Sequence, residues 1–245
     1  MTKIKQEWFQ EWFDQEEYHL LYMYRDKTEA SHLIDKLINS LRLTKGSKVL
    51  DLACGRGRHS HYLHQKGFST YGIDLSKRSL AYARHYQDAE IRFIHHDMRQ
   101  PFPVNDFEAV FNFFTSFGYF SSFEEHSNVI GNVAHALKKG GFIILDYLNA
   151  LPIRNKLRPY ETITREDVTF KIKRFIEGNK IIKEITFDRH GQISVYREEV
   201  AAFTLNDFMK LFDENGITIR DTYGDYQLNS YDESTSDRLI LIGQK

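Results

Sequence analysis

The sequence predicts an α/β fold of the doubly wound type, with a seven-stranded and mostly parallel sheet, from three features. Short apolar runs alternate with helical segments between residues 46 and 148, and this rhythm is typical of βαβ units in a parallel sheet. A helical pattern precedes the alternation, and a stretch with the two-residue period of antiparallel strands follows it. We therefore expect an N-terminal helical cover over residues 1–45, a core over 46–148 and 204–245, and an antiparallel β insertion over 149–203.

The elements of the core have recognisable boundaries. Gly67 stands where a glycine ends a helix, and Ser76 stands where a serine caps the next one. The Ser122-x-x-Glu125 pattern is a capping box, which predicts a helix that continues to Gly140-Gly141. Right-handed crossovers are the default connection between parallel strands. The first five strands are predicted at residues 48–53, 69–73, 91–95, 107–113 and 142–146.

The segments that flank this core have other periods. Apolar and aromatic residues recur every three to four positions over about 4–43, which predicts two helices with a break near Asp26-Lys27. Alternating apolar and polar residues predict a three-stranded antiparallel meander over about 160–202. A capped helix is expected between Thr204 and Gly216. Two final strands, at 217–223 and 238–242, complete the predicted sheet.

Composition narrows the classes of function. The 33 basic residues are balanced by 34 acidic ones, so the overall charge lacks the positive excess that most nucleic-acid binders use. Cys54 is the single cysteine of the sequence, which excludes an intramolecular disulfide and fits a reducing compartment. The charged start contains no signal core, and no apolar run approaches the roughly 18 residues of a membrane span. We expect a cytoplasmic protein that acts on no membrane and for which a nucleic-acid partner is disfavoured.

A glycine-rich turn follows the first predicted strand. Gly55 and Gly57 have no Cβ atom, so their backbone N–H groups can approach a ligand at the start of the next helix. Dinucleotide sites use the same geometry, but Ser60 stands where their third glycine belongs. A carboxylate at the end of the second strand, Asp74, can accept hydrogen bonds from both hydroxyls of a ribose. A second acid, Asp97, follows the third strand.

Three segments resemble the successive motifs of class I S-adenosylmethionine-dependent methyltransferases. They are Val49-Leu-Asp-Leu-Ala-Cys-Gly-Arg-Gly-Arg-His59, Tyr71-Gly-Ile-Asp-Leu-Ser76 and His96-Asp-Met98. The resemblance implies the Rossmann-like methyltransferase fold and S-adenosyl-L-methionine as the cofactor, with S-adenosyl-L-homocysteine as product. In that family the glycine-rich turn packs against the methionine part, the acid after strand two holds the ribose, and the acid after strand three meets the adenine amino group.

The resemblance extends to the start of the chain. Tyr18-His-Leu-Leu-Tyr22, together with residues 114–120, is similar to segments of small bacterial members of the family. It implies that the N-terminal helices cover the cofactor, with Tyr18, Tyr24 or Arg25 near its carboxylate, which a guanidinium can bind with two parallel hydrogen bonds. The residues expected to contact the cofactor are Tyr18, Arg25, Asp51, Ala53, Gly55, Gly57, Asp74, Leu75, Asp97, Met98 and Phe113.

Metal chemistry is not predicted. His95-x-Asp97 has the spacing of two ligands of an iron oxygenase, but that site belongs to a different framework. The histidines at 59, 61 and 64 have no cysteine or carboxylate partner in the pattern. The sulfonium activates its own methyl group, so the chain must mainly align a nucleophile and exclude water. No catalytic residue is assigned, although the segments of Tyr119, His96 and Tyr231 are expected to border the cleft.

The sequence therefore predicts an enzyme that moves a methyl group from S-adenosylmethionine to a small-molecule acceptor by direct in-line displacement. Three alternatives stay open: an RNA or protein methyltransferase, a nicotinamide oxidoreductase, and a noncatalytic cofactor-binding module. The missing third glycine and Asp97 disfavour the oxidoreductase. The insertion is expected to cover the cleft and select the substrate, or to build a contact between the subunits of a homodimer.

Overall fold

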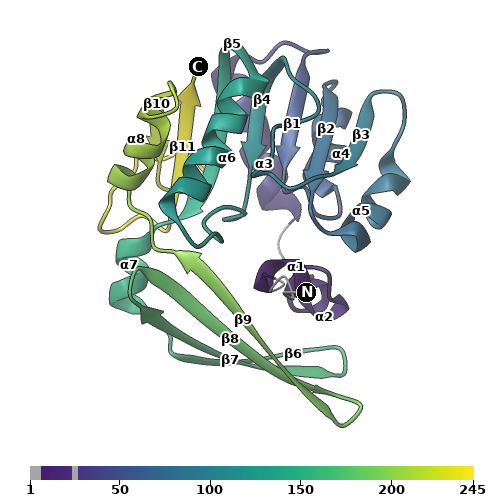
Figure 1. Cartoon of the computed structure of the whole chain (residues 1–245), viewed down its shortest axis with the longest axis vertical. Helices are drawn as coiled ribbons and strands as arrows, with labels where there is room; N and C mark the ends of the chain where they lie inside the picture. The colour runs from purple at the N-terminus through teal and green to yellow at the C-terminus, as the bar shows by residue number, and fades with distance from the viewer. Residues whose placement is uncertain (1–6, 24–26) are drawn as a thin grey trace, which may run out of the picture.

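The computed structural model describes residues 7–23 and 27–245, without the side chains of residues 27–30 and 156. Its main body is a seven-stranded sheet in the order β10-β11-β5-β4-β1-β2-β3 (Figure 1). The strands from β5 to β3 are parallel neighbours, and β11 is antiparallel to β5 and β10. The doubly wound α/β fold is confirmed. Its strands are β1 (Lys48–Leu52), β2 (Ser69–Asp74), β3 (Ile91–His95), β4 (Phe107–Asn112), β5 (Leu137–Leu148), β10 (Thr218–Tyr223) and β11 (Arg238–Gln244).

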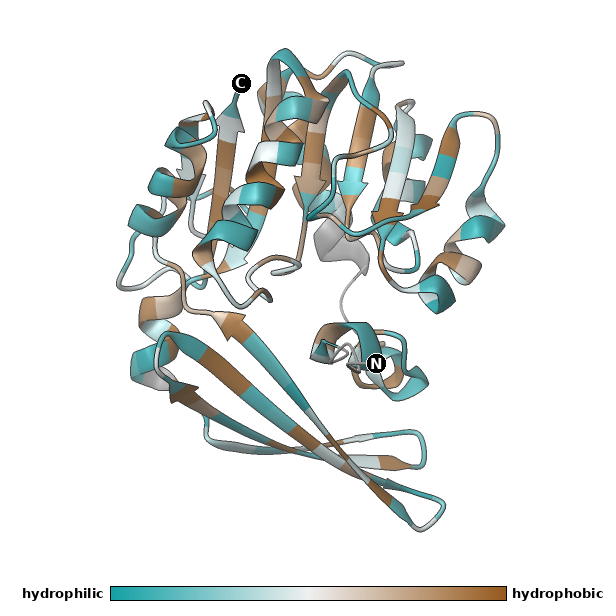
Figure 2. Cartoon of the chain, viewed as in Figure 1, coloured by the Kyte–Doolittle hydropathy of each residue, from teal (hydrophilic) through white to brown (hydrophobic). Residues whose placement is uncertain are grey.

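Helices cover both faces of this sheet. One hydrophobic cluster joins it to α6 (Phe123–Ala136) and α8 (Leu205–Asp213), through residues such as Val129 and Phe208. A second cluster joins the other face to α3 (Lys27–Leu41) and α4 (Arg58–Gln65), through Leu33 and Leu63. In Figure 2 brown predominates in the central strands β4, β5 and β11, since both of their faces are buried against helices. The helix α5 (Lys77–Ala83) packs beside β3 at the sheet's edge.

The predicted caps hold, but one predicted helix end is wrong. Ser122 and Glu125 form the capping box of α6, and the Ser76 hydroxyl accepts the Ser79 N–H at 2.9 Å. The helix α6 ends at Ala136 and not at Gly140-Gly141, because Leu137 already has the extended dihedrals φ −74° and ψ 140°. Its side chain is buried and its backbone pairs with Phe107, so the last predicted turn of helix is the start of β5.

The N-terminal cover contains more helices than the pattern predicts. Within the described residues up to Leu41 there are three, α1 (Trp8–Trp12), α2 (Glu16–Leu21) and α3, and the predicted break at Asp26 lies outside the described residues. The unexpected break follows Trp12, where Gln15 is extended at ψ 149°. This break lets Trp12 and Leu21, from separate helices, pack in one cluster against the antiparallel strands of the insertion.

The insertion is a four-stranded antiparallel sheet, so the prediction of three strands is wrong by one. Its order is β6-β7-β8-β9, with β6 (Tyr160–Arg165), β7 (Val168–Glu177), β8 (Lys180–Arg189) and β9 (Gln192–Ala201). The strand β6 has no fully buried side chain, so its apolar alternation is weak. A short helix, α7 (Ala150–Lys156), which was not predicted, connects β5 to this sheet.

Figure 1 shows where these parts meet. The parallel strands run downward in the view, so that their carboxyl ends face α1, α2 and the small sheet. Contacts between α1 and β9 join the cover to the insertion. None of the helices within residues 7–23 and 27–245 combines the length and the apolar character that crossing a membrane requires.

Candidate functional site

The loop after β1 has a backbone that side chains seldom tolerate. Ala53, Gly55 and Gly57 all have positive φ angles, of 62°, 55° and 77°. The two glycines differ in their surroundings. A Cβ atom on Gly57 would lie 2.8 Å from the ring of Phe93, whereas a Cβ on Gly55 would meet no atom within 4 Å. Gly57 therefore serves close packing, and Gly55 leaves open space over the loop, as the approach of a ligand requires.

This difference predicts two distinct phenotypes. Gly57→Ala adds a clash with Phe93 to the strain of a positive φ, so we expect a loss of roughly 2–4 kcal/mol in the free energy of unfolding. Gly55→Ala carries the strain alone, of about 1–2 kcal/mol, but places a methyl group over the open loop. We expect it to weaken ligand binding more than Gly57→Ala does at a temperature where both are folded. Urea unfolding and calorimetric titration of the matched pair test this, and equal losses of stability would contradict it.

Asp74 joins this loop to the end of β2. One carboxylate oxygen accepts the Gly55 N–H at 2.8 Å, and the other accepts the Ser76 N–H at 2.7 Å. Burial raises the pKa of Asp74, and the backbone hydrogen bonds partly offset that effect. Each carboxylate oxygen has a further lone pair. The side chain can therefore hold the loop and still accept hydrogen bonds from the hydroxyls of a ligand.

Asp51 has a different role from the other acids. Its side chain is only 1% exposed, and the Ser60 hydroxyl donates to it at 2.6 Å. Burial raises the pKa of Asp51 to about 6, although the hydrogen bonds from Ser60 oppose the shift. The carboxylate thus braces the turn between β1 and α4 from beneath. Ser60, the residue that replaces a third glycine, is its partner.

The raised pKa of Asp51 predicts a pH dependence of stability. The folded state retains a proton on this group at pH values where the unfolded chain, with a pKa near 3.8, has lost it. The free energy of unfolding should therefore fall as pH rises from about 4 to about 6, with a contribution from Asp51 of roughly 3 kcal/mol. Asp51→Asn should remove this contribution. The difference in the free energy of unfolding between the variant and the parent protein should therefore change over this range of pH. Urea unfolding at several pH values measures it, and two parallel pH profiles would contradict the assignment.

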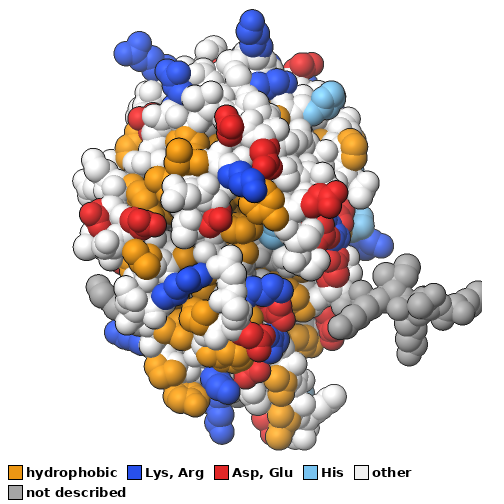
Figure 3. Space-filling model, turned by 60° about the vertical axis from the view of Figure 1, so that its left-hand side comes forward, with side chains coloured by type: hydrophobic (Ala, Val, Ile, Leu, Met, Phe, Trp, Pro, Cys, Tyr) orange, Lys and Arg blue, Asp and Glu red, His pale blue; other side chains and the backbone are white. Residues whose placement is uncertain are grey.

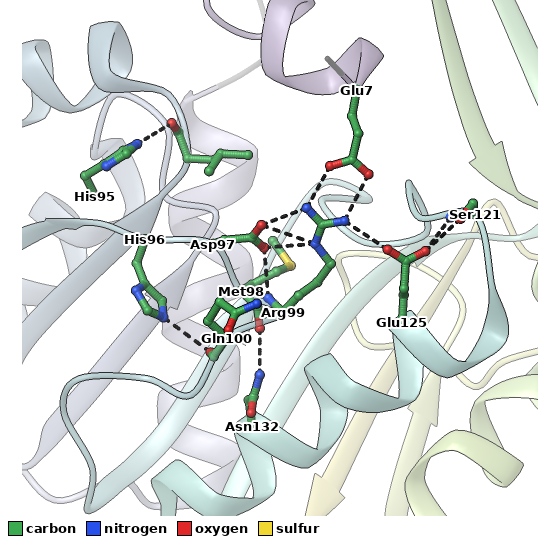
Figure 4. A network of polar contacts seen from close by, with 11 residues as sticks. Glu7, His95, His96, Asp97, Met98, Arg99, Gln100, Ser121, Glu125 and Asn132 are labelled. Atoms are coloured by element: carbon green, nitrogen blue, oxygen red, sulfur yellow. Dashed lines mark hydrogen bonds and ion pairs between the residues drawn. The ribbon is translucent and has the colours of Figure 1, made fainter. Parts of the chain in front are cut away.

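Figure 4 shows that Asp97 belongs to a network centred on Arg99. The guanidinium contacts the Asp97 carboxylate through Nη2 at 2.7 Å, Glu7 at 2.7 Å and Glu125 at 2.9 Å. Burial disfavours ionisation of Asp97, but the hydrogen bonds from Arg99 dominate and lower its pKa. The network ties the N-terminal cover and the start of α6 to the end of β3. Asn132 of α6 adds a hydrogen bond to the Met98 carbonyl at 3.1 Å.

The loop after β4 is held in an unusual conformation by Asp146 of β5. Phe114 and Thr115 both have positive φ angles, of 57° and 60°. Asp146 is fully buried and accepts hydrogen bonds from the Phe114 N–H at 2.8 Å and from the Tyr226 hydroxyl at 3.0 Å. Its other oxygen pairs with the Arg238 guanidinium at 2.6 Å. Strained backbone of this kind persists only where surrounding contacts hold it, and it is frequent at functional sites.

A cavity of about 620 Å³ lies beside this loop, between the core, the cover and the insertion. Its volume is within the range typical of small-molecule sites. None of the three acids at the strand ends, Asp51, Asp74 and Asp97, lines it. Aromatic side chains form much of one wall, and charged side chains of the insertion form another. The lining residues are Trp8, Phe13, Tyr18, Tyr22, Phe114, Thr115, Ser116, Tyr119, Leu148, Ile153, Leu157, Arg158, Glu161, Arg174, Ile181, Lys183, Glu198, Val200 and Arg238.

Comparisons with known proteins agree with this geometry. A family model described as a methyltransferase domain matches residues 49–141, the segment that carries the glycine-rich loop and all three acids. A crystal structure of an S-adenosylmethionine-dependent methyltransferase from Clostridium acetobutylicum superposes with a TM-score of 0.79 and 20% identity, over 92% of this chain and 94% of that one. Residues 49–141 are therefore a methyltransferase domain, and the whole chain has the fold of the S-adenosylmethionine-dependent methyltransferases. The predicted family and its cofactor, S-adenosyl-L-methionine, are thereby confirmed.

Several relatives of this methyltransferase have named substrates, and two of them differ in the acceptor. One is the dTDP-3-amino-3,4,6-trideoxy-α-D-glucopyranose N,N-dimethyltransferase of Streptomyces venezuelae, which is 34% identical over 133 residues, 53% of this chain and 54% of the relative. The other is the glycine/sarcosine N-methyltransferase of Aphanothece halophytica, which is 27% identical over 223 residues, 85% of this chain and 80% of the relative. The match thus spans about half the length of the first relative and four fifths of the second.

Most residues predicted for the cofactor of this methyltransferase lie at the carboxyl ends of its strands. Leu75 and Met98 are half-buried and pack against the same hydrophobic cluster, next to the loop that Asp74 holds. Phe113 is buried beneath the strained loop and does not itself line the cavity, which its neighbour Phe114 does. Tyr18 lines the cavity, and Arg25 lies outside the described residues.

The three segments proposed to border the cleft behave differently. Tyr119 lines the cavity, and its hydroxyl donates to the Thr115 carbonyl. His96 and Tyr231 do not line this cavity, so the place of their segments at the cleft stays a prediction. The Nε2 atom of His96 contacts the Gln100 carbonyl oxygen at 3.3 Å, because its side chain turns along the loop after β3. The Tyr231 hydroxyl donates to Asn149 at 3.2 Å, and burial raises its pKa to about 12.

Sequence reasoning missed the residues that bind these segments together. Arg99 stands two positions after the predicted acid Asp97, and that i, i+2 spacing was the available signal. Glu7, Asp146 and Arg238 had no such signal, because each acts on a residue far along the chain. His95 contacts the Leu75 carbonyl at 3.0 Å, and among the described residues no group of three or more His, Cys, Asp or Glu is arranged to hold a metal ion.

Proposed function

We propose that this methyltransferase transfers the methyl group of S-adenosylmethionine to an amine nitrogen of a small molecule. The observation that carries the proposal is the cavity of about 620 Å³ next to the strained loop after β4, at the same edge of the sheet as the cofactor residues. The amine is proposed because the two relatives described above are both N-methyltransferases. A cavity of this volume suits a small acceptor better than a folded RNA or protein.

The residues at the strand ends fit the cofactor. Asp74 would accept the ribose hydroxyls, and the open space over Gly55 would admit the methionine part. Leu75 and Met98 would flank the adenine ring, with Asp97 near its amino group. Phe113 would lie beneath the reacting centre. Ala53 and Gly57 would shape the glycine-rich loop, and Asp51 would support that loop without contacting the cofactor. Tyr18 and Arg25 stay the proposed partners of the carboxylate.

The chain itself has to orient the acceptor and exclude water. S-adenosylmethionine supplies an electrophilic methyl group, so direct in-line displacement requires no covalent catalyst. Trp8 and Phe13 of the cover and Tyr119 of the core contact one another edge to face, at ring-centroid distances of 5.2 to 5.4 Å. This aromatic wall would hold the acceptor against the loop at Phe114 and Thr115 and keep water from the reacting atoms.

The residues that line the cavity indicate separate roles for the cover, the insertion and the core. The cover (1–45) supplies Trp8, Phe13, Tyr18 and Tyr22, and the insertion (149–203) supplies the charged wall. We therefore assign acceptor selection to these two parts and cofactor binding to the core (46–148 and 204–245). A homodimer, a cytoplasmic location and the absence of nucleic-acid partners stay predictions.

Transfer of a labelled methyl group tests the proposal. The protein is incubated with S-[methyl-³H]adenosylmethionine in a series of separate reactions, each with one candidate acceptor. The acceptors are an amino-sugar nucleotide, glycine, a mixture of primary and secondary amines, bulk RNA and unfolded protein. We expect label in a small amine and a mass increase of one methylene group, and none with the Asp74→Ala variant. Label in RNA or protein alone would overturn the choice of acceptor. Binding of the cofactor without transfer to any class would favour the noncatalytic module.

A further inference from the structure

One row of the small sheet brings charges of the same sign together. In the register of the insertion Arg174 of β7 is directly opposite Lys183 of β8, and Lys183 is directly opposite Glu198 of β9. All three side chains line the cavity, and they are only 23%, 15% and 14% exposed. Two cations directly opposite each other on neighbouring antiparallel strands are destabilising.

The carboxylates nearby offset this repulsion only in part. Glu161 contacts Arg174 at 2.5 Å, and Glu198 is 3.7 Å from Lys183. Glu198 is also shared, because Trp12 donates to it at 2.7 Å and Tyr22 at 2.8 Å. The cavity wall thus keeps two half-buried cations side by side, although the next pair on the same face of the sheet, two positions along each strand, is the apolar pair Ile172 and Ile185.

A further cation stands at the same wall. Arg158 lines the cavity just before β6, and the backbone there is joined to β7 by the hydrogen bond from the Arg174 N–H to the Pro159 carbonyl at 2.8 Å. Among the residues that the structure describes, Arg158 makes no ion pair. On the face drawn in Figure 3, blue basic side chains lie beside orange hydrophobic ones at the level where the insertion meets the core.

The charge balance of the lining is positive. Four basic side chains line the cavity against two acidic ones, in a chain whose formal net charge is −1. Arg238 is balanced by the buried Asp146 behind the lining, and Arg174 and Lys183 have one carboxylate each. The remaining positive charge is that of Arg158. A ligand that brings a negative charge to this wall would give Arg158 a partner of opposite charge.

We infer that the methyl acceptor carries an anionic oxygen group, a carboxylate or a phosphate, which Arg158, Arg174 and Lys183 bind at the insertion side of the cavity. The inference rests on the proposed function and names its substrate class as an anionic small amine. Planar guanidinium groups bind carboxylate and phosphate with two parallel hydrogen bonds, and the Lys183 ammonium adds a point charge. The anion would anchor the acceptor at the insertion while its amine extends toward the loop at Phe114.

Calorimetric titration with simple anions tests the inference without knowledge of the acceptor. Pyrophosphate and succinate are titrated separately into the protein saturated with S-adenosylhomocysteine. We expect at least one of them to bind, about tenfold more weakly to Arg158→Ala and to Lys183→Met, and more weakly in added salt. The preferred probe distinguishes a phosphate from a carboxylate. Lys171→Met is the matched control, since Lys171 is on β7 but exposed and not a lining residue, and it should bind as the parent does.

The results of this titration distinguish a failure of the inferred anion site from a failure of the proposed function. Binding of S-adenosylhomocysteine without binding of either anion would overturn the inference and leave the proposed function in place. Equal anion affinity in the parent and in Arg158→Ala would also overturn it, because the anion would then bind elsewhere. Arg158 is exposed and without an ion pair, so its variant is expected to fold normally. Failure to bind S-adenosylhomocysteine would instead overturn the proposed function.

Discussion

Replacing Asp74 with alanine is expected to weaken the binding of S-adenosylhomocysteine by about a hundredfold or more. The change removes the acceptor of the Gly55 N–H, which positions the glycine-rich loop, together with the proposed acceptor of the ribose hydroxyls. Loss of charge-assisted hydrogen bonds worth about 3 kcal/mol in total corresponds to this factor. Isothermal titration calorimetry measures the ratio of dissociation constants.

The control for this variant is a second aspartate with similar local contacts. Asp88 also accepts two backbone N–H groups, from Glu90 at 2.7 Å and Ile91 at 3.0 Å, but it precedes β3 and lies at the opposite end of the strand from Asp97. Asp88→Ala should therefore bind S-adenosylhomocysteine as the parent does. Equal losses in the two variants would mean that Asp74 matters only for local structure.

Removal of the Asp146 carboxylate is expected to be the most destabilising single change of those considered. Asp146→Ala leaves the Arg238 guanidinium, the Phe114 N–H and the Tyr226 hydroxyl without their shared acceptor. Breaking a buried ion pair from one side costs about 3–5 kcal/mol. We expect a decrease of that size in the free energy of unfolding and loss of methyl transfer, since the strained loop at Thr115 is released.

A double variant tests the origin of this effect. In Asp146→Ala combined with Arg238→Met the unpaired charge is absent, so the double variant should recover part of the stability lost by Asp146→Ala. Methyl transfer should stay low in both, because the Phe114 N–H still lacks its acceptor. Urea unfolding of the set gives the coupling energy. Strictly additive losses would show that the ion pair does not hold the loop.

The core was predictable because its signals are local. The apolar run from Val49 to Leu52 lies between turn residues, and the capping box of Ser122 and Glu125 satisfies neighbouring backbone groups. The glycines at 55 and 57 and the acid at 74 stand where backbone geometry restricts the choice of residue. Such positions can be recognised in a sequence without knowledge of the rest of the fold.

The remaining features depend on contacts between distant residues. Nothing near Trp12 marks the end of its helix, which is set by packing against the small sheet. The strand β6 was missed because it buries no side chain fully, although it pairs in register with β7. Arg99 reaches Glu7 across 92 positions, and Arg238 reaches Asp146 across the same separation. Periodicity and spacing contain no information on pairs of this kind.

The most direct test of the central claim is a calorimetric titration of the purified protein with S-adenosylhomocysteine and, separately, with NADH. Both ligands contain an adenosine, but only the former has a sulfur and an amino acid part to occupy the space over Gly55. The account predicts saturable binding of S-adenosylhomocysteine at one site and no binding of NADH. Binding of NADH alone would contradict the account.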